Sequence, residues 1–434
     1  MTVPDPLRLA IIGAGSRGSG YARRARVEGA RITAVVEPDE GRLRAFLEEF
    51  ADQSIRVLPD WEALAALPDR IADAAVVATP DRLHVEPAIG LAEAGYHLLL
   101  EKPIAPTEAE SARVVAAAKD AGVMLAVCHV MRYSGYSRAL KRLLDEGAIG
   151  RLVSVEHLEP IGWWHFAHSY VRGNWAREED SGPLLLTKSS HDIDWLSYIV
   201  GLPARRVSSF GSLLHFRPEN KPADAAPRCV DCPLQNSCAY SATTIYRGFL
   251  GDETFERWPL SVLTVDVTAG GVDRALREGP YGRCVFDGQN DVVDHQVVNI
   301  EYEGGVTASF TLTAFTELDF RKTRLFGTTG CIEGDGRTLR VHDFVRDEKY
   351  EITPGSSGNA SAADGHGGAD DALVRAFLDA VRTGDHSNLL SGPDESLDTH
   401  RIVWLAEESR ARGSVVEVPP MPRATPSGQR VPAS

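Results

Sequence analysis

Short apolar segments alternate with longer amphipathic ones over about the first 130 residues of the chain. Apolar runs of five or six residues are typical of buried strands, and amphipathic segments between them are typical of helices. Such alternation predicts βαβ units and a parallel sheet. The predicted strands are Leu7–Ile12, Arg31–Val36, Ala74–Ala78, Tyr96–Leu100 and Met124–Cys128, and the predicted helices include Ser19–Glu28, Gly41–Phe50 and Thr107–Ala121.

The pattern changes after Cys128. A helix over Tyr136–Glu146 and a strand over Leu152–Leu158 precede the segment Gly182–Gly201, in which Leu186–Val200 has helical spacing. Several strands then follow one another without helices between them, which predicts a mostly antiparallel sheet. These strands are Val292–Tyr302, Val306–Phe315, Lys322–Phe326 and Thr338–His342, and helices near Asp370–Arg382 and Pro393–Arg412 close the fold.

Composition and charge narrow the class of protein. The 434 residues include 46 Lys plus Arg and 61 Asp plus Glu, which gives a net charge of −15. An acidic surface repels phosphate backbones, so we expect no nucleic-acid partner. No apolar run approaches the roughly 20 residues that span a bilayer, and the first residues lack the features of a secretory signal. We therefore expect a cytoplasmic protein with no membrane partner.

A glycine-rich loop follows the first predicted strand directly and leads into a helix. It reads Gly13-Ala14-Gly15-Ser16-Arg17-Gly18. Such a pattern between a strand and a helix is the fingerprint of dinucleotide binding, because the glycines allow a tight turn and close approach of the pyrophosphate. The free N–H groups of the helix N-terminus favour the phosphates. The loop therefore predicts an NAD(P) site in a Rossmann domain.

An acidic residue, Glu37, ends the second predicted strand. A carboxylate there accepts hydrogen bonds from the adenosine ribose hydroxyls and repels a 2′-phosphate, which favours NAD over NADP. Arg17 is an argument for NADP, since its guanidinium is able to pair with a phosphate. A solvated turn before Pro38 is the alternative interpretation of Glu37.

Further motifs give the chain its resemblance to a known family. They are Ala78-Thr79-Pro80-Asp81 with His84, Glu101-Lys102-Pro103 after the fourth strand, and Ser190-His191-Asp192 before an apolar helix that ends at Gly201. With the glycine loop, they make nearly the whole chain resemble the glucose–fructose oxidoreductase/inositol dehydrogenase (Gfo/Idh/MocA) family. The predicted cofactor-binding residues are Gly13, Gly15, Ser16, Arg17, Gly18, Glu37, Thr79, Pro80, His84 and Glu101.

The resemblance implies a Rossmann domain followed by an α/β domain with an open, mainly antiparallel sheet, with the substrate held between them. It implies oxidation of a secondary hydroxyl of a sugar, polyol or related compound, or reduction of the matching ketone. Lys102 corresponds to the lysine that binds the reacting oxygen, and His191 to the general acid/base. Both roles suit the chemistry, because a histidine exchanges protons near neutral pH and an ammonium stabilises an alkoxide.

One position departs from the commonest family pattern. Many members have an aspartate four residues before the histidine, where this chain has Thr187. Lys188, the next residue, is the candidate to shape the site in place of that aspartate. We predict it as a third catalytic residue. A helix over Leu186–Val200 would bring Thr187, Lys188 and His191 near one face. The alternatives are a structural histidine, and a lysine at position 102 that only pairs with a carboxylate.

Other residues are candidates for contact with the substrate. Arg132 and Tyr133 follow the last strand of the first domain, and Trp163 belongs to an aromatic segment suited to a sugar ring, although aromatic clusters also form cores. Asp192 neighbours His191, and His366 lies in a glycine-rich loop. The predicted substrate-binding residues are Arg132, Tyr133, Trp163, Asp192 and His366.

Four of the six cysteines have the spacing of metal ligands: Cys229, Cys232, Cys238 and Cys284. Thiolates this close together suit tetrahedral Zn²⁺, which would stabilise an irregular insertion. We therefore predict a structural zinc site, with free cysteines or an iron–sulfur cluster as alternatives.

These expectations combine into one domain plan. Residues 1–130 form an NAD(P)-binding Rossmann domain, and residues 131–418 form a substrate-binding and oligomerisation domain with a cysteine-containing insertion at about 218–290. Residues 419–434 form a disordered tail. We expect a homo-oligomer, dimer or tetramer, that acts on a carbohydrate-like small molecule. The alternative functions are a redox-neutral, NAD-dependent lyase or glycosidase, and a non-catalytic nucleotide sensor.

Overall fold

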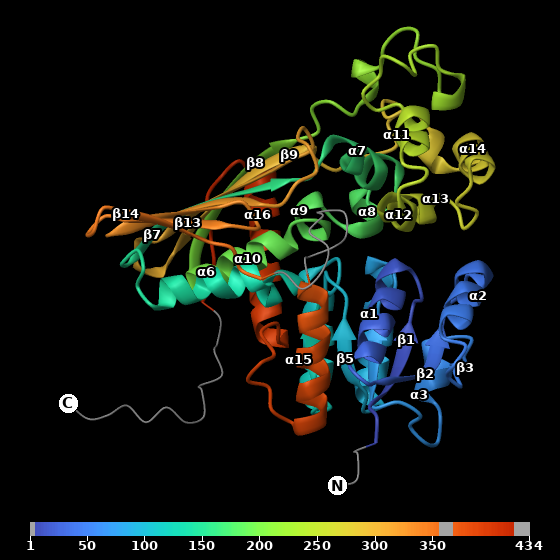
Figure 1. Cartoon of the computed structure of the whole chain (residues 1–434), viewed down its shortest axis with the longest axis horizontal. Helices are drawn as coiled ribbons and strands as arrows, with labels where there is room; N and C mark the ends of the chain where they lie inside the picture. Colours follow the sequence, from blue (N-terminus) through green and yellow to red (C-terminus); the bar gives the residue numbers. More distant parts are fainter. Residues whose placement is uncertain (1–4, 356–367, 421–434) are drawn as a thin grey trace.

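The computed structural model describes residues 5–355 and 368–420 and contains two sheets (Figure 1). His366 and residues 421–434 of the predicted tail lie outside the described residues. Within the described ranges, no helix is long and apolar enough to cross a membrane.

The first sheet has six parallel strands in the order β3-β2-β1-β4-β5-β6. Its order is that of a Rossmann fold, and ligands bind such sheets at the carboxyl ends of the strands. The strands are β1 Arg8–Ile12, β2 Arg31–Val36, β3 Arg56–Val57, β4 Ala74–Val77, β5 His97–Leu100 and β6 Leu125–Val127. The predicted parallel sheet is confirmed.

Helices cover both faces of this sheet because its strands are apolar on both sides. One face packs against α1 (Ser16–Val27), α2 (Glu40–Glu49) and the late helix α15 (Ala369–Thr383). The other face packs against α3 (Trp61–Ala65), α4 (Val85–Glu93) and α5 (Glu108–Asp120). The loops at the carboxyl ends of the strands are thus held by two apolar layers.

The second sheet has nine strands in the order β14-β13-β12-β11-β7-β10-β9-β8-β15. Only β7 and β10 pair in parallel, so the predicted open and mainly antiparallel sheet is also confirmed. Its strands are β7 Leu152–Pro160, β8 Ala204–Ser212, β9 His295–Tyr302, β10 Thr307–Thr313, β11 Lys322–Gly327, β12 Gly330–Gly334, β13 Leu339–Asp343, β14 Glu348–Ile352 and β15 Val416–Glu417.

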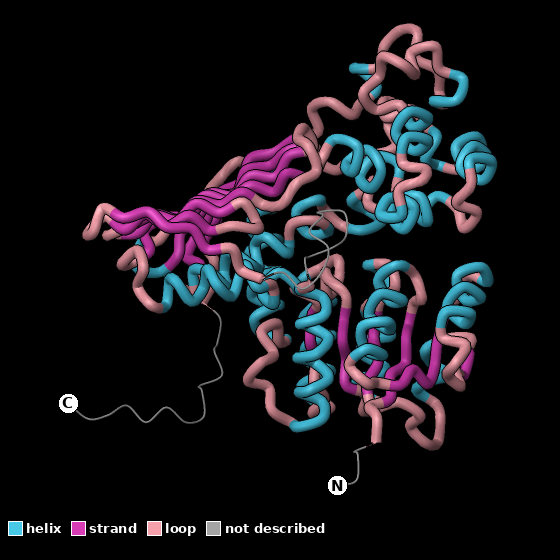
Figure 2. Tube along the Cα trace, viewed as in Figure 1, coloured by secondary structure: helices cyan, strands magenta, loops and turns pink. Residues whose placement is uncertain are grey.

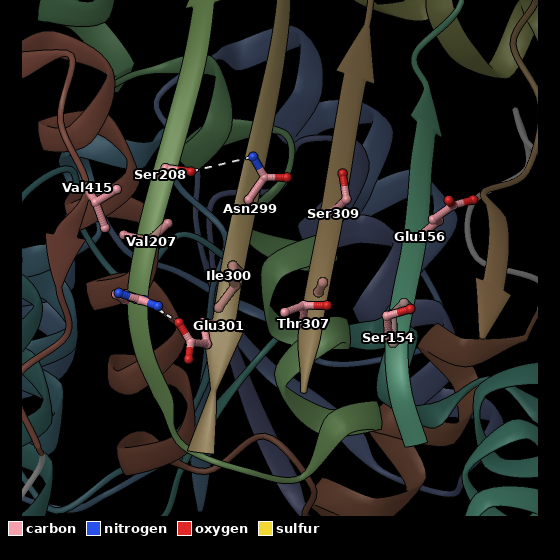
Figure 3. Close-up of a pocket in the computed structure, with 13 residues that line it drawn as sticks. Ser154, Glu156, Val207, Ser208, Asn299, Ile300, Glu301, Thr307, Ser309 and Val415 are labelled. Carbon is pink, nitrogen blue, oxygen red and sulfur yellow. Dashed lines mark hydrogen bonds and ion pairs between the residues drawn. The ribbon is translucent and has the colours of Figure 1, made fainter. Parts of the chain in front are cut away.

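Helices cover one face of the nine-stranded sheet and leave the other open (Figure 2). The covered face packs against α6 (Gly135–Asp145), α10 (Ser190–Val200) and α16 (Pro393–Arg412). Small polar side chains such as Ser208, Asn299 and Ser309 line a shallow hollow on the open face (Figure 3). This hollow is separated from the Rossmann domain by the sheet itself and by its helical layer.

An insertion between β8 and β9 forms a small helical unit of its own. Its helices are α11 (Ala242–Gly248), α12 (Glu253–Phe255), α13 (Ser261–Leu263) and α14 (Ala269–Glu278). They enclose a separate apolar cluster that includes Tyr246, Leu260 and Leu276. In Figure 1 the unit lies beside the nine-stranded sheet and above α1 and α2 of the Rossmann domain.

Candidate functional site

The glycine loop connects β1 to α1 and has the shape of a phosphate cradle. Gly13 has a φ of +90°, and a Cβ there would lie 2.7 Å from the carbonyl oxygen of Ala78. A Cβ at Gly18 would lie 1.9 Å from the Gly13 oxygen, whereas one at Gly15 would meet nothing within 4 Å. Gly13 and Gly18 are therefore needed for the turn and the packing, and Gly15 leaves open space on the side where a phosphate would approach.

The N-terminus of α1 suits an anion. Its N-cap, Gly15, provides no side-chain hydrogen bond, and its first turn contains no acidic residue. Ser16 is exposed at the first helical position. The unpaired N–H groups and the helix dipole therefore face the open space at Gly15. These residues fit the pyrophosphate of a dinucleotide.

Two charged residues flank the loop. Glu37 accepts hydrogen bonds from the backbone N–H groups of Ala14 at 2.8 Å and Asp39 at 2.9 Å, which fixes its carboxylate beside the loop. Arg17 forms ion pairs with Glu101 and, at 2.7 Å, with Asp370. The charge of Arg17 is therefore matched by carboxylates of this chain, which weakens the argument that it pairs with a 2′-phosphate.

The loops after β4 and β5 are joined by His84. Its Nδ1 lies 2.7 Å from the carbonyl oxygen of Pro103 and its Nε2 lies 2.8 Å from that of Thr79. The ring is 1% exposed, so it holds the Thr79-Pro80 turn against the Lys102-Pro103 turn from inside the protein. His84 is placed to shape the predicted cofactor site rather than to line its surface.

Lys102 follows β5 and extends across to the second domain. Its Nζ donates a hydrogen bond of 2.5 Å to the carbonyl oxygen of Thr187. Burial lowers the pKa of Lys102, and the charges of Lys188 and Arg17 lower it further, against the opposing effect of Glu101 and Asp81. Glu101 itself accepts bonds of 2.8 Å from the Tyr21 hydroxyl and from the backbone N–H of Lys102. Lys102 is therefore a positioned ammonium whose proton is held less tightly than usual.

The predicted helix over Leu186–Val200 is wrong in one respect, because it is broken at Lys188 and Ser189. The short helix α9 (Leu184–Thr187) ends there and α10 begins at Ser190. The bend lets Thr187 turn its carbonyl to Lys102, while its hydroxyl stays buried and bonds back to Pro183 at 3.4 Å. Thr187 thus acts through its backbone and supplies no charge.

Lys188 and His191 lie at this junction. The Nζ of Lys188 pairs with Glu159 of β7 at 2.9 Å. His191 is 6% exposed, and its ring lies edge-on to that of His129 with 6.0 Å between centroids. Burial lowers the pKa of His129 to about 4, against the opposing charge of Asp194, and the charges of Arg132 and Lys102 lower it further. Lys102, Lys188 and His191 are thus brought to one region between the domains.

Asp192 is bonded to residues of the second domain. It is fully buried, with its Oδ1 3.1 Å from Nε2 of His157 and 2.9 Å from Nε of Arg321. Although burial raises the pKa of Asp192, the charge of Arg321 and the bond from His157 lower it more, and the net pKa is well below its usual range. Asp192 therefore acts by holding Arg321 in place.

The other predicted substrate contacts are used inside the protein. Arg132 makes two bonds of 2.7 Å to Asp194 and one of 2.7 Å to the carbonyl oxygen of Leu390. The Tyr133 hydroxyl accepts the backbone N–H groups of Leu390 and Ser391 at 2.8 and 3.1 Å. Trp163 packs beside the insertion, against Tyr240. None of the three is brought close to Lys102 by a described contact.

Several further polar residues of this region were not among the predicted site residues. Asp81 is buried, which raises its pKa, and it accepts a 2.9 Å bond from Nε1 of Trp175 across the domains. Burial also raises the pKa of Tyr170, and the charges of Glu159 and Asp81 raise it further, which places its phenol among these carboxylates. Arg321 bridges Asp192 and Glu159. Two sequence signals were available: Asp81 belongs to the Ala78–Asp81 motif, and Glu159 is a polar residue at the end of a strand.

The structure does not support the predicted zinc site. Among the described residues, no group of three or more His, Cys, Asp or Glu side chains is arranged to hold a metal ion. The thiol of Cys229 instead lies 3.6 Å from the guanidinium of Arg172, a cation that would oppose a second one. The insertion has its own apolar cluster, so the premise that it lacks a core was wrong.

Comparison with known proteins agrees with both domains. Residues 7–129 match the model of an oxidoreductase family with an NAD-binding Rossmann fold, and residues 141–418 match the C-terminal α/β domain of the same family. Inositol 2-dehydrogenase 1 of Saccharopolyspora erythraea is 37% identical over 34% of this chain and 44% of its own. The 2,7-anhydro-N-acetylneuraminate hydratase of Escherichia coli is 27% identical over 49% of this chain and 55% of its own.

A solved oxidoreductase from Agrobacterium radiobacter, in complex with NAD⁺, L-tartaric acid and magnesium, has the same fold. It superposes with a TM-score of 0.69 at 18% identity, covering 95% of this chain and 98% of its own. The matches to the curated relatives span about half to two-thirds of their length. Since the two family models together cover most of the sequence, the chain belongs to the Gfo/Idh/MocA oxidoreductase family.

Proposed function

We propose that the chain is an NAD-dependent oxidoreductase that interconverts a secondary hydroxyl and the matching ketone of an uncharged sugar, polyol or related compound. The observation that carries the proposal is the position of Lys102. It follows β5 at the same sheet edge as the glycine loop and bonds to Thr187, beside the junction that holds Lys188 and His191. A dinucleotide and a substrate would therefore meet in one cleft.

When bound, the nicotinamide supplies the hydride acceptor or donor. The ammonium of Lys102 stabilises negative charge on the reacting oxygen, which is worth most in a site shielded from water. His191 takes or returns the hydroxyl proton as general acid/base. Lys188 holds Glu159 and adds positive charge beside Lys102.

The acidic turn after β2 supports NAD over NADP. The turn after β2 contains two carboxylates, Glu37 and Asp39, which would repel a 2′-phosphate bound there. Arg17 is already paired with Glu101 and Asp370. Repulsion between these carboxylates and the phosphate would disfavour NADP.

The balance of charges supports an uncharged substrate. Lys188 is matched by Glu159, Arg321 by Glu159 and Asp192, and Lys102 by the nearby charges of Glu101 and Asp81. A carboxylate on the substrate would have to compete with these acidic groups for the same cations. Hydroxyl groups, in contrast, hydrogen-bond to both signs of charge.

The experiment is a screen of sugars, polyols and their corresponding acids with NAD⁺ or NADP⁺. NADH formation is followed by absorbance and substrate loss by chromatography in the same samples. We expect NADH formation with at least one neutral polyol or sugar and a higher kcat/KM for it than for the matching acid. Binding of NADH with no turnover of any compound would instead favour a nucleotide sensor.

A redox-neutral reaction is the second candidate function, because one relative is a hydratase that acts on an anhydro sugar. In such a reaction one carbon is oxidised and then reduced again on a cofactor that stays bound. Substrate loss without net NADH in the same screen would favour this candidate.

We also propose that a second copy of the chain packs on the open face of the nine-stranded sheet. The face carries small polar side chains around Ser309 (Figure 3). Phe210 lies two residues after Ser208 on β8, so on the same face of the strand, and is exposed. Light scattering should give a mass of two or four chains. Ser309→Arg should lower that mass and Ser261→Arg, in the insertion, should not. A monomeric wild type would contradict this proposal.

A further inference from the structure

The insertion approaches the part of the Rossmann domain that carries Glu37. In Figure 1 the segment between α13 and α14 descends toward the N-terminal end of α2. The side chain of Val265 lies close to this end of α2, because a Cβ added at Gly41, in the first turn of α2, would be 3.8 Å from its Cγ1. Thus two segments more than 200 residues apart in sequence meet at the end of β2.

A second pair of residues, Arg42 and Tyr281, also indicates that α2 and the insertion are close. Burial raises the pKa of Tyr281, which follows α14, and the charge of Arg42 on α2 partly opposes this effect. Arg42 itself lies in the turn that is capped by Asp39, whose carboxylate accepts its backbone N–H at 2.8 Å.

The loop that carries Val265 is held in a defined shape. Asp266 accepts a 2.8 Å hydrogen bond from the Thr268 hydroxyl and pairs with Arg274 at 2.8 Å. Thr268 also caps α14 by accepting the N–H of Gly271 at 3.2 Å. The loop is therefore anchored to α14, and the neighbouring Val267 packs against the apolar cluster of the insertion.

Val265 is exposed, unlike the other valine of this loop, Val267, which is partly buried. Val265 is 76% exposed, although it is a branched apolar residue on a well-anchored loop. Gly41 lies four residues after Glu37, so a side chain beside Gly41 would be near the adenosine half of a dinucleotide whose ribose is bound by Glu37. A ribose bound by Glu37 would have the insertion on one side and the glycine loop on the other.

We propose that the loop Thr264–Thr268 forms a second wall of the cofactor site and that Val265 contacts the adenosine half of bound NAD, so that the insertion slows cofactor release. The inference rests on the proposed NAD site and adds a binding residue from the other domain. An apolar contact that is made only in the bound state lowers the dissociation rate more than the association rate. It also suits a cofactor that is retained over several turnovers.

The test is the dissociation rate of NADH from the full chain, measured by stopped-flow fluorescence after mixing with excess NAD⁺. In Val265→Asp, a carboxylate would face Glu37, Asp39 and the phosphates. We expect a dissociation rate at least ~10-fold faster than in the wild type, equivalent to about 1.4 kcal/mol. Val345→Asp is the matched control, since Val345 is 77% exposed on the distant β13–β14 turn. We expect its rate to stay within about twofold of the wild type.

Thermal unfolding of both variants verifies that each one folds, which is expected because both positions are exposed. Wild-type binding of NADH together with an unchanged dissociation rate in Val265→Asp would overturn the inference and leave the proposed function standing. A wild type that binds no NADH would overturn both.

Discussion

At the scale of single residues, the account depends on a histidine and two lysines in one cleft. His191 is the proposed acid/base, and its replacement by Asn should keep the size of the side chain but remove the proton exchange. We expect kcat to fall about 10²- to 10⁴-fold with little change in NADH affinity. His386→Asn, at an exposed position, is the control and should keep wild-type kcat. Steady-state kinetics and NADH titration measure both, and a kcat within threefold of wild type would rule out this role.

Lys188 should act on Lys102 through its charge. Because that charge lowers the pKa of Lys102, Lys188→Met should raise it. The reaction needs a protonated Lys102, so the alkaline limb of the pH–kcat profile should move to higher pH. Thermal unfolding is measured alongside, because the variant also removes the 2.9 Å pair with the buried Glu159. An alkaline limb that stays in place while stability falls would show that Lys188 is only structural.

The sequence indicated Lys102, Lys188 and His191 but not the ion pairs and hydrogen bonds that hold the residues around them. Lys102 and His191 were predicted because short motifs surround them. Arg321 and Glu159 lie 162 positions apart and meet only because β7 and β11 pair, which no local pattern reveals. Arg132 was predicted to reach the substrate, but it is bonded to Asp194, a partner that only the tertiary packing brings to it.

At the scale of elements, the β1–loop–α1 unit makes a prediction that separates folding from binding. Gly15→Ala adds a methyl group into open space, so the free energy of unfolding should change by less than about 0.5 kcal/mol. The same methyl group would cover the N–H groups of the cradle, and NADH affinity should fall at least ~10-fold.

The matched variant is Gly18→Ala, whose Cβ would lie 1.9 Å from the Gly13 oxygen. It should destabilise the protein by about 1–3 kcal/mol because α1 must move away from β1. Urea unfolding and NADH titration of both variants provide the measurements. Full NADH affinity in Gly15→Ala would argue against phosphate binding at this loop.

Elements with a clear period were predicted well, and elements with mixed signals were missed. The strands of the parallel sheet are mostly apolar, and all five predicted strands match, whereas the two-residue β3 was not predicted. Helix α4 was missed because Pro87 suggests a break, although proline is tolerated in the first turn of a helix. Strand β8 was missed because only Val207 and Ser209 are buried within a largely polar segment. The break at Lys188 could not be predicted, because no glycine or proline lies at that position.

At the scale of the whole molecule, α16 joins the two domains beside the proposed site, where the ring of His400 lies 5.4 Å from that of His129. It packs against β8 and α5, and His400 lies at its centre, fully buried. The Nδ1 of His400 donates to the Ser396 carbonyl at 2.6 Å, and its Nε2 accepts the Ile104 N–H at 3.2 Å. Only the neutral ring makes both bonds, so protonation would break the contact between the domains.

Stability should therefore fall as the pH falls below neutrality. Burial lowers the pKa of His129 to about 4 and those of His168 and His400 to about 3, against a usual value of 6.5. Above pH 6.5 both the folded and the unfolded chain keep these rings neutral. Between pH 6.5 and 4 the unfolded chain gains the protons first, so unfolding becomes easier by up to about 1.4 kcal/mol per pH unit for each histidine.

Urea unfolding at pH 7, 6 and 5 measures this dependence. The slope of the free energy of unfolding against pH should fall in His400→Gln by the contribution of about one proton. A glutamine oxygen still accepts the Ile104 N–H but does not titrate. His386→Gln, at an exposed position, should leave the slope as it is. Identical slopes in the two variants would show that protonation of His400 does not contribute to the pH dependence of stability.

The central claim is that the cleft between the two domains binds NAD and uses Lys102 for chemistry rather than for folding or cofactor binding. The most direct measurement is kcat and the NADH dissociation constant of Lys102→Met beside those of Lys119→Met, a lysine 48% exposed on α5. We predict a kcat at least ~100-fold lower in Lys102→Met, with an NADH dissociation constant within about threefold of wild type, and no change in Lys119→Met. A Lys102→Met variant with wild-type kcat would contradict the account.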